Sequence, residues 1–117
     1  MKLAINTLLS VQVSATAELI CLMRHAGLDA AKAIEIVSST PVASPAAKVA
    51  AAAMIAVNFA PMFPVDLAEK DLGYVLEMAR SSGARLPFAE AARSVFKQGI
   101  ARGHGPDNIT AVIKLYP

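Results

Sequence analysis

Glycine and proline divide this chain into segments, and this division restricts the possible folds more than any other feature of the sequence. Each segment spaces its apolar residues as one face of a helix does, and no alternating strand pattern of useful length is present. The expected helices cover about 2–25, 29–38, 45–57, 65–82, 87–103 and 107–115. We therefore predict an all-α fold, a single bundle of about six helices joined by short loops.

Capping residues set the expected ends of these helices. Gly27 should end the first helix, and Asp29 should cap the second. Ser44 is a cap residue followed by Pro45 at the first helical position. Asp107 is predicted to cap the final short helix, which would run to about residue 115.

Two prolines interrupt the stretch 58–64 and exclude a regular helix there. This stretch is expected to be an extended loop, and 103–106 is expected to be a turn. Gly73 is unusual because it lies inside a predicted helix instead of at its end. A glycine in that place indicates a close approach between two helices.

The first segment, from Leu3 to Met23, is long and apolar enough to raise the question of a membrane span. A spanning helix would bury seven polar residues in lipid, and no signal-peptide cleavage pattern is present. We therefore predict a long buried helix of a soluble domain. The polar residues are Asn6, Thr7, Ser10, Gln12, Ser14, Thr16 and Glu18.

The apolar content of the chain points to a partner surface. Hydrophobic residues make up 56% of the 117 residues and charged residues 17%, compared with about 45–50% and about 25% in an average soluble domain. A single domain of this size cannot bury so much apolar surface alone. Another subunit or another domain is expected to cover the rest.

The charged and cysteine residues exclude several functions. The net charge is +2, the basic residues are scattered and aromatic residues make up 5%, so no nucleic-acid footprint is present. The single Cys21 rules out an internal disulfide and indicates a reducing, cytoplasmic location. Its apolar neighbours predict a buried thiol. No cluster of cysteine and histidine residues offers a metal site.

Two groups of residues could carry chemistry. Lys2 and Asn6 are four residues apart and share a helix face, so a lysine could exchange a proton with a substrate oxygen beside an amide. Phe63, on the proline-flanked loop, precedes the pair Lys70-Asp71. Such an aromatic could stack on a flat ring, and the lysine could bind a phosphate. From spacing alone, the more common explanation of the first group is the solvated start of a helix. That of the second is a loop phenylalanine packed into the core beside a solvated ion-pair face.

The ordered set of motifs resembles the C-terminal all-α domain of the β-hydroxyacid dehydrogenase family, which includes 3-hydroxyisobutyrate dehydrogenase and tartronate semialdehyde reductase and is related to 6-phosphogluconate dehydrogenase. The resemblance covers nearly the whole chain. The motifs, in family order, are KLAIN (2–6), AE (17–18), AGLD (26–29), FPVDLAEKDL (63–72), GARLP (83–87) and GHGPD (103–107).

The resemblance implies a role for each of these residues. Lys2 would be the catalytic acid/base, and Asn6 would help to position it and the substrate. Phe63, Lys70 and Asp71 would lie by the cofactor, which would be NAD or NADP. The family often has a second asparagine before the one that matches Asn6; Ile5 occupies that place here. The implied reaction is hydride transfer between the nicotinamide and a small hydroxyacid or semialdehyde.

The family's N-terminal Rossmann domain, which holds most of the cofactor, has no counterpart in residues 1–117. The expectation is therefore a C-terminal substrate and oligomerisation domain that is inactive alone and forms a homodimer or tetramer. Two alternatives stay open. One is a free-standing helical dimerisation module without catalysis, and the other is a generic helical bundle whose motifs arose by chance.

Overall fold

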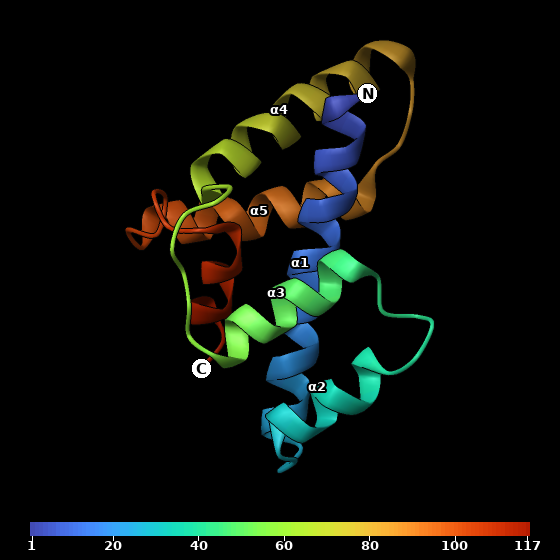
Figure 1. The fold of residues 1–117 in the computed structure, drawn as a ribbon. Helices are drawn as coiled ribbons and strands as arrows, with labels where there is room; N and C mark the ends of the chain where they lie inside the picture. Colours follow the sequence, from blue (N-terminus) through green and yellow to red (C-terminus); the bar gives the residue numbers. More distant parts are fainter.

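The computed structural model describes residues 1–117 and contains five α-helices and one short 3-10 helix. Apart from one isolated antiparallel bridge between Pro64 and Asn108, it contains no β-structure. The predicted all-α class is confirmed (Figure 1). The elements are α1 (Lys2–His25), α2 (Ala30–Ser38), α3 (Pro45–Ile55), α4 (Val65–Ser82), α5 (Pro87–Ala101) and η1 (Ile109–Leu115).

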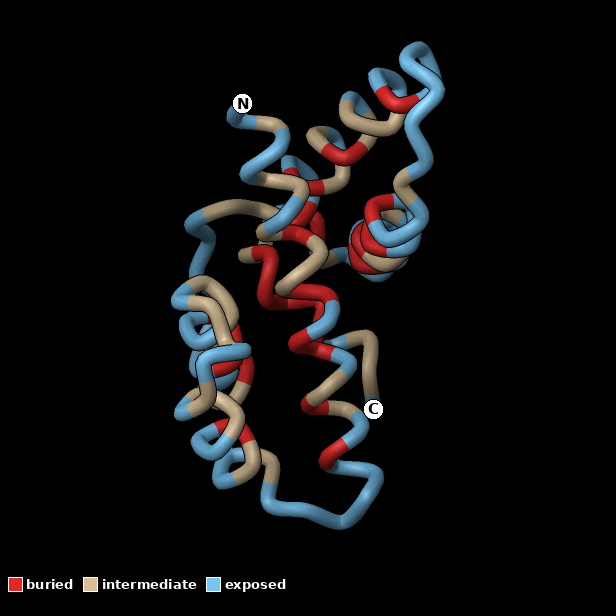
Figure 2. Tube along the Cα trace, turned by 90° about the vertical axis from the view of Figure 1, so that its right-hand side faces the viewer, coloured by how far each residue is buried: buried red, intermediate tan, exposed pale blue.

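Helix α1 runs through the middle of the molecule and contacts all the other elements. Figure 2 shows buried residues concentrated along its central part. By length and composition alone α1 could also cross a membrane, a property that core helices share. Three of its polar residues, Ser10, Ser14 and Thr16, are buried inside the bundle. The Ser10 hydroxyl has no hydrogen-bond partner, whereas Ser14 and Thr16 donate their hydroxyl hydrogens to the carbonyls of Ser10 and Gln12, one turn earlier. The hydroxyls of Ser14 and Thr16 therefore find their partners within the helix itself.

One apolar core joins all six elements. Its largest fully buried side chains are Phe96 of α5, Ile20 of α1, Met54 of α3 and Leu72 of α4. Helix η1 closes the core from the side with Val112, which is also fully buried. Burial of these side chains supplies most of the driving force for folding.

The predicted caps form as expected at three helix ends. The carboxylate of Asp29 accepts a hydrogen bond from the Lys32 amide at 3.3 Å, and the Ser44 hydroxyl accepts one from the Ala47 amide at 3.0 Å. Gly27 follows α1 with a φ of 78°, a left-handed conformation that glycine adopts without strain.

Other helix ends differ from the prediction. Helix α3 ends at Ile55, and Val57, which was expected to be helical, has a φ of 55°. The prediction that Asp107 caps the last helix is wrong. That helix is a 3-10 helix without a side-chain cap, and Asn108 precedes it. The Asp107 carboxylate instead lies 3.6 Å from His104 Nδ1 and 3.5 Å from Lys114 Nζ.

The close approach predicted at Gly73 is present, and a side chain of α5 makes it. A Cβ atom at residue 73 would lie only 2.8 Å from Nη2 of Arg93. The Arg93 guanidinium is fixed there by Glu69, whose Oε1 is 3.1 Å from Arg93 Nε. The prediction for Cys21 needs correction, because its side chain is half-buried on α1.

Candidate functional site

A hydrogen bond between α1 and α4 joins two of the residues that the sequence singled out. Asn6 Nδ2 donates to Asp71 Oδ2 at a distance of 2.9 Å, although the two residues are 65 positions apart. Both side chains are half-buried. Packing of α1 against α4 sets this register, since Leu72 and Ile20 are buried in the same core.

Lys2 extends the same face by one turn of α1. It is exposed and has no ion pair, so its ammonium is free to meet a ligand. The Asn6 amide gives a hydrogen to Asp71, and its carbonyl oxygen has no partner within the chain. This oxygen can accept a hydrogen from an ammonium or from a substrate hydroxyl. The face thus combines a proton donor, an acceptor and a carboxylate on rigid helices.

The structure places the other two predicted residues differently. Lys70 is adjacent to Asp71 in sequence but lines a separate cavity of about 380 Å³ with Glu69, Tyr74 and Arg93. Phe63 lies two residues before α4 begins, and its half-buried ring packs against the core. At about 1.5 Å of rise per residue, this is roughly two helical turns from Asp71. Asn6 and Asp71 are brought together, whereas Lys70 lines another cavity and Phe63 packs against the core.

The most voluminous of the described cavities, about 420 Å³, contains none of these predicted residues. It lies where α4 turns into α5 and is lined by Arg80, Arg85, Arg93 and Glu90 among others. The adjoining cavity adds Lys70, Glu69 and Glu77, so cationic and anionic groups nearly balance along this trough. A balanced, open set of charges is typical of a solvated surface.

The chain does not form a dinucleotide cradle of the usual strand–turn–helix kind, since no strand precedes a helix. Its three left-handed glycines, Gly27, Gly83 and Gly103, all follow the ends of helices. The second oxygen of the Asp71 carboxylate is available to accept a hydroxyl or amide hydrogen.

One polar residue with an organising role was missed by sequence reasoning. Asn108 accepts hydrogen bonds from the backbone amides of Met62 and Phe63 and so holds the loop that carries Phe63. The available signal was its position in a turn after Pro106 and Asp107, where asparagine side chains often bind backbone groups.

Comparisons with known proteins agree on one family. Residues 1–116 match the family model described as the NAD-binding region of NADP-dependent 3-hydroxyisobutyrate dehydrogenase. L-threonate dehydrogenase of Cupriavidus necator is 32% identical over 114 residues, which cover 97% of this chain and 38% of that enzyme. Glyoxylate/succinic semialdehyde reductase 2 of Arabidopsis thaliana, a chloroplastic protein, is 29% identical over 114 residues, 97% of this chain and 32% of that enzyme.

A crystal structure of 3-hydroxyisobutyrate dehydrogenase from Salmonella typhimurium superposes with a TM-score of 0.92 at 27% identity, covering 98% of this chain and 40% of that protein. The chain thus spans between about a third and two-fifths of the length of these relatives. The expected cofactor class, NAD or NADP, is confirmed by the family match. The chain belongs to the NAD-binding family of NADP-dependent 3-hydroxyisobutyrate dehydrogenase, whose members are oxidoreductases of hydroxyacids and related compounds.

Proposed function

We propose that this chain is the C-terminal all-α domain of an NAD(P)-dependent 3-hydroxyacid dehydrogenase or semialdehyde reductase, and that Lys2 is its acid/base group. The observation that carries the proposal is the Asn6–Asp71 hydrogen bond beside Lys2. Lys2 lies one helical turn before Asn6 on α1, and Asp71 of α4, 65 positions from Asn6 in the sequence, accepts the hydrogen bond of Asn6. The family match over residues 1–116 supports the dehydrogenase part of this proposal.

Each residue has a distinct task in this proposal. The Lys2 ammonium donates a proton to the carbonyl oxygen during reduction, and the neutral amine takes a proton from the hydroxyl during oxidation. Asn6 holds the Lys2 ammonium or the substrate through its free carbonyl oxygen. Asp71 fixes the orientation of the Asn6 amide. Bound NAD(P) supplies or accepts the hydride.

Phe63, Lys70 and Asp71 are proposed to contact the cofactor from this side. The Lys70 ammonium suits a phosphate oxygen, and the exposed part of the Phe63 ring suits a flat ring. A dinucleotide-binding domain with a glycine-rich turn would hold the pyrophosphate and close the open face. We therefore expect residues 1–117 alone to have no turnover with NADPH or NADH and a small semialdehyde.

The test of this function is Lys2→Ala in a protein that joins this domain to a dinucleotide-binding domain of the same family. Loss of general acid–base catalysis should lower kcat by about 10²- to 10⁴-fold. Lys2→Arg is the matched control because arginine keeps the positive charge but does not release its proton at neutral pH. Arginine should fail to restore turnover, and unchanged kcat in Lys2→Ala would contradict the role of Lys2.

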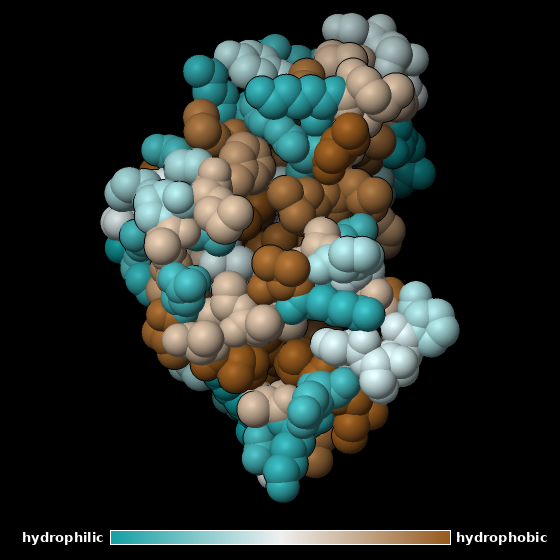
Figure 3. Space-filling model, in the orientation of Figure 1, coloured by the Kyte–Doolittle hydropathy of each residue, from teal (hydrophilic) through white to brown (hydrophobic).

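A second candidate, a helical dimerisation module without catalysis, is favoured by the apolar surface. Figure 3 shows apolar atoms gathered along the face over which Figure 1 draws α1. Ile5 and Leu8 of α1 and Phe88 of α5 are 60–78% exposed. A homodimer or tetramer, or contact with the cofactor-binding domain, would cover such residues. Sedimentation equilibrium on this chain measures its self-association. Full activity of Lys2→Ala in the protein joined to a dinucleotide-binding domain would favour the dimerisation module over the catalytic role.

A further inference from the structure

The loop 56–64 between α3 and α4, which carries Phe63, is attached to the C-terminal part of the chain by backbone hydrogen bonds. The amide of Asn108 donates to the carbonyl of Phe59 at 3.1 Å, and the amide of Ile109 donates to the carbonyl of Phe63 at 2.8 Å. Just after the loop, the amide of Val65 donates to the carbonyl of Asp107 at 2.9 Å. Residues 107–109 therefore act as a short partner strand for the loop.

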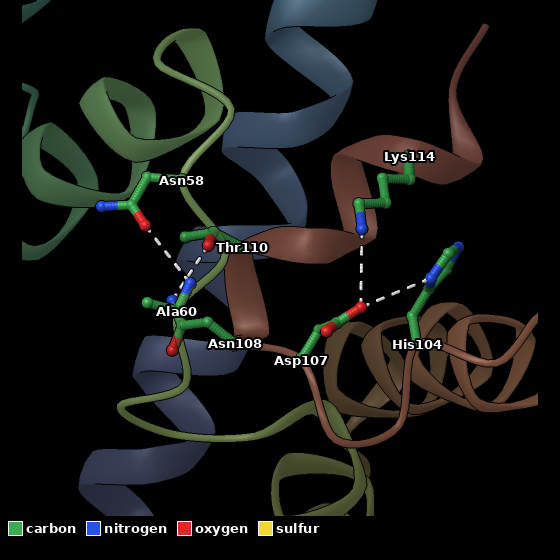
Figure 4. A network of polar contacts seen from close by, with 7 residues as sticks. All are labelled: Asn58, Ala60, His104, Asp107, Asn108, Thr110 and Lys114. Atoms are coloured by element: carbon green, nitrogen blue, oxygen red, sulfur yellow. Dashed lines mark hydrogen bonds and ion pairs between the residues drawn. The ribbon is translucent and has the colours of Figure 1, made fainter.

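The Asn108 side chain reaches into the loop and binds its backbone directly. Its Oδ1 accepts from the amides of Met62, at 3.1 Å, and Phe63, at 3.0 Å. Its Nδ2 donates to Oγ1 of the buried Thr110 at 2.9 Å (Figure 4). Two donors on one side and an acceptor on the other fix the orientation of the amide group.

A second attachment holds the beginning of the same loop. Lys114 Nζ lies 4.5 Å from the centre of the Phe59 ring and 3.5 Å from Asp107 Oδ2. His104 approaches the same carboxylate oxygen, with its Nδ1 3.6 Å away. Figure 4 shows the side chains of His104 and Lys114 converging on Asp107, away from the contact between Asn108 and Thr110. This group is partly exposed, so its contribution is smaller than that of Asn108.

The rings of Phe59 and Phe63 pack against the core, but few hydrogen bonds within the loop fix its backbone. Its one internal side-chain bond joins Asn58 Oδ1 to the Ala60 amide at 3.3 Å, and two prolines lack an amide hydrogen. The Met62 side chain is 90% exposed, so packing does not fix the backbone there. The amides of Met62 and Phe63 would otherwise face solvent. The acceptor that orders them is the Asn108 side chain.

We propose that Asn108 is a positioning residue that fixes the backbone of Met62 and Phe63 and thereby sets how the Phe63 ring is presented to the cofactor. The part of this inference that concerns the cofactor rests on the proposed function, whereas the attachment of the loop does not. A carboxylate at position 108 keeps both acceptor contacts and can accept from Thr110, so Asn108→Asp should preserve the arrangement.

The attachment is tested by amide hydrogen exchange on residues 1–117, comparing Asn108→Ala with Asn108→Asp. In Asn108→Ala, exchange at Met62 and Phe63 should accelerate about tenfold or more, while Ile20 in the core of α1 keeps its protection. Asn108→Asp should retain slow exchange at both amides. Asn58→Ala is the matched control, since it removes an asparagine of the same loop that binds only Ala60. Equal protection in Asn108→Ala, or fast exchange in Asn108→Asp, would overturn the inference.

The functional part is tested by steady-state kinetics in the protein joined to a dinucleotide-binding domain. Phe63→Ala and Asn108→Ala should each raise KM for NADPH or NADH several-fold, leave kcat within about twofold, and show no further effect when combined. Asn108→Asp should restore KM. If Phe63→Ala leaves KM unchanged, the cofactor role of Phe63 in the proposed function fails, and hydrogen exchange still decides whether Asn108 holds the loop. If Phe63→Ala raises KM and Asn108→Ala does not, the positioning role is overturned.

Discussion

Asn6 of α1 donates a hydrogen bond of 2.9 Å to Asp71 of α4. Removal of one side chain leaves the other without its partner. Because both side chains are half-buried, water replaces the lost hydrogen bond only in part. We expect Asn6→Ala to lower the free energy of unfolding by about 1–2 kcal/mol. Asn6→Asp should lower it further, since two carboxylates would then face each other. Urea unfolding followed by circular dichroism measures both effects.

An exchange of the two side chains makes this prediction specific. The double variant Asn6→Asp with Asp71→Asn restores one amide and one carboxylate across the same helix pair. It should recover most of the stability lost in Asn6→Asp. If the two single changes instead add in the double variant, the hydrogen bond does not join the helices in solution.

Gly73→Ala tests the contact between α4 and the Arg93 guanidinium. Alanine favours a helix interior by about 1 kcal/mol relative to glycine. A Cβ atom would lie 2.8 Å from Arg93 Nη2 and should displace that flexible group, weakening its pair with Glu69. Because this pair is partly exposed, its loss costs about 0–1 kcal/mol. Gly73→Ala should therefore stabilise the Arg93→Ala background more than the natural chain, as thermal unfolding measures. The same gain in both backgrounds would exclude the displacement.

Truncation of two phenylalanines of α5 should affect the free energy of unfolding to very different extents. Phe96 is 0% exposed, and Phe96→Ala should lower the free energy of unfolding by about 3–5 kcal/mol, a large share of the stability of such a domain. Phe88 is 78% exposed, and Phe88→Ala should change it by less than about 0.5 kcal/mol in dilute solution. Denaturant unfolding at two protein concentrations makes the comparison. An effect of Phe88→Ala that appears only at the higher concentration would place its ring in a self-association surface.

Tyr116 should make stability fall at alkaline pH. Burial raises the pKa of its phenol above the usual value, and the nearby Glu18 carboxylate and Cys21 thiolate raise it further. The folded chain therefore keeps this proton at a pH where the unfolded chain has released it. Its contribution is complete below about pH 10, the unfolded pKa, and is lost as the pH rises through the folded pKa. Tyr116→Phe should show a shallower decline above about pH 10 in urea titrations; an equal slope in both proteins would refute the link.

Local signals in the sequence were sufficient to predict most of the helices. Asp29 and Ser44 cap α2 and α3, and Pro87 begins α5, because each acts through its own conformation or through a hydrogen bond three residues away. The prediction failed where a distant partner decides. Asp107 looks like a cap, yet His104 and Lys114 pair with its carboxylate, and the segment around it serves the loop before α4.

The candidate site was predictable as a set of residues and not as an arrangement. Spacing places Lys2 and Asn6 on one helix face. The partner of Asn6 depends on how α1 and α4 pack, and packing arises from the whole core, including Ile20 and Leu72. The separate position of Lys70 has a local origin instead, because adjacent residues of a helix point about 100° apart.

The attachment of the loop to residues 107–109 also has a consequence for synthesis on the ribosome. The roughly 45 residues between Phe63 and Asn108 take on the order of 2–9 s to translate. During this interval the nascent loop already displays Phe59, Met62 and Phe63 but lacks the chain that will order it. The helices of the first half can pair early, whereas the loop 56–64 becomes ordered only after residues 107–109 have been made. Apolar side chains of this loop therefore stay without their final arrangement until the last part of the chain has been made.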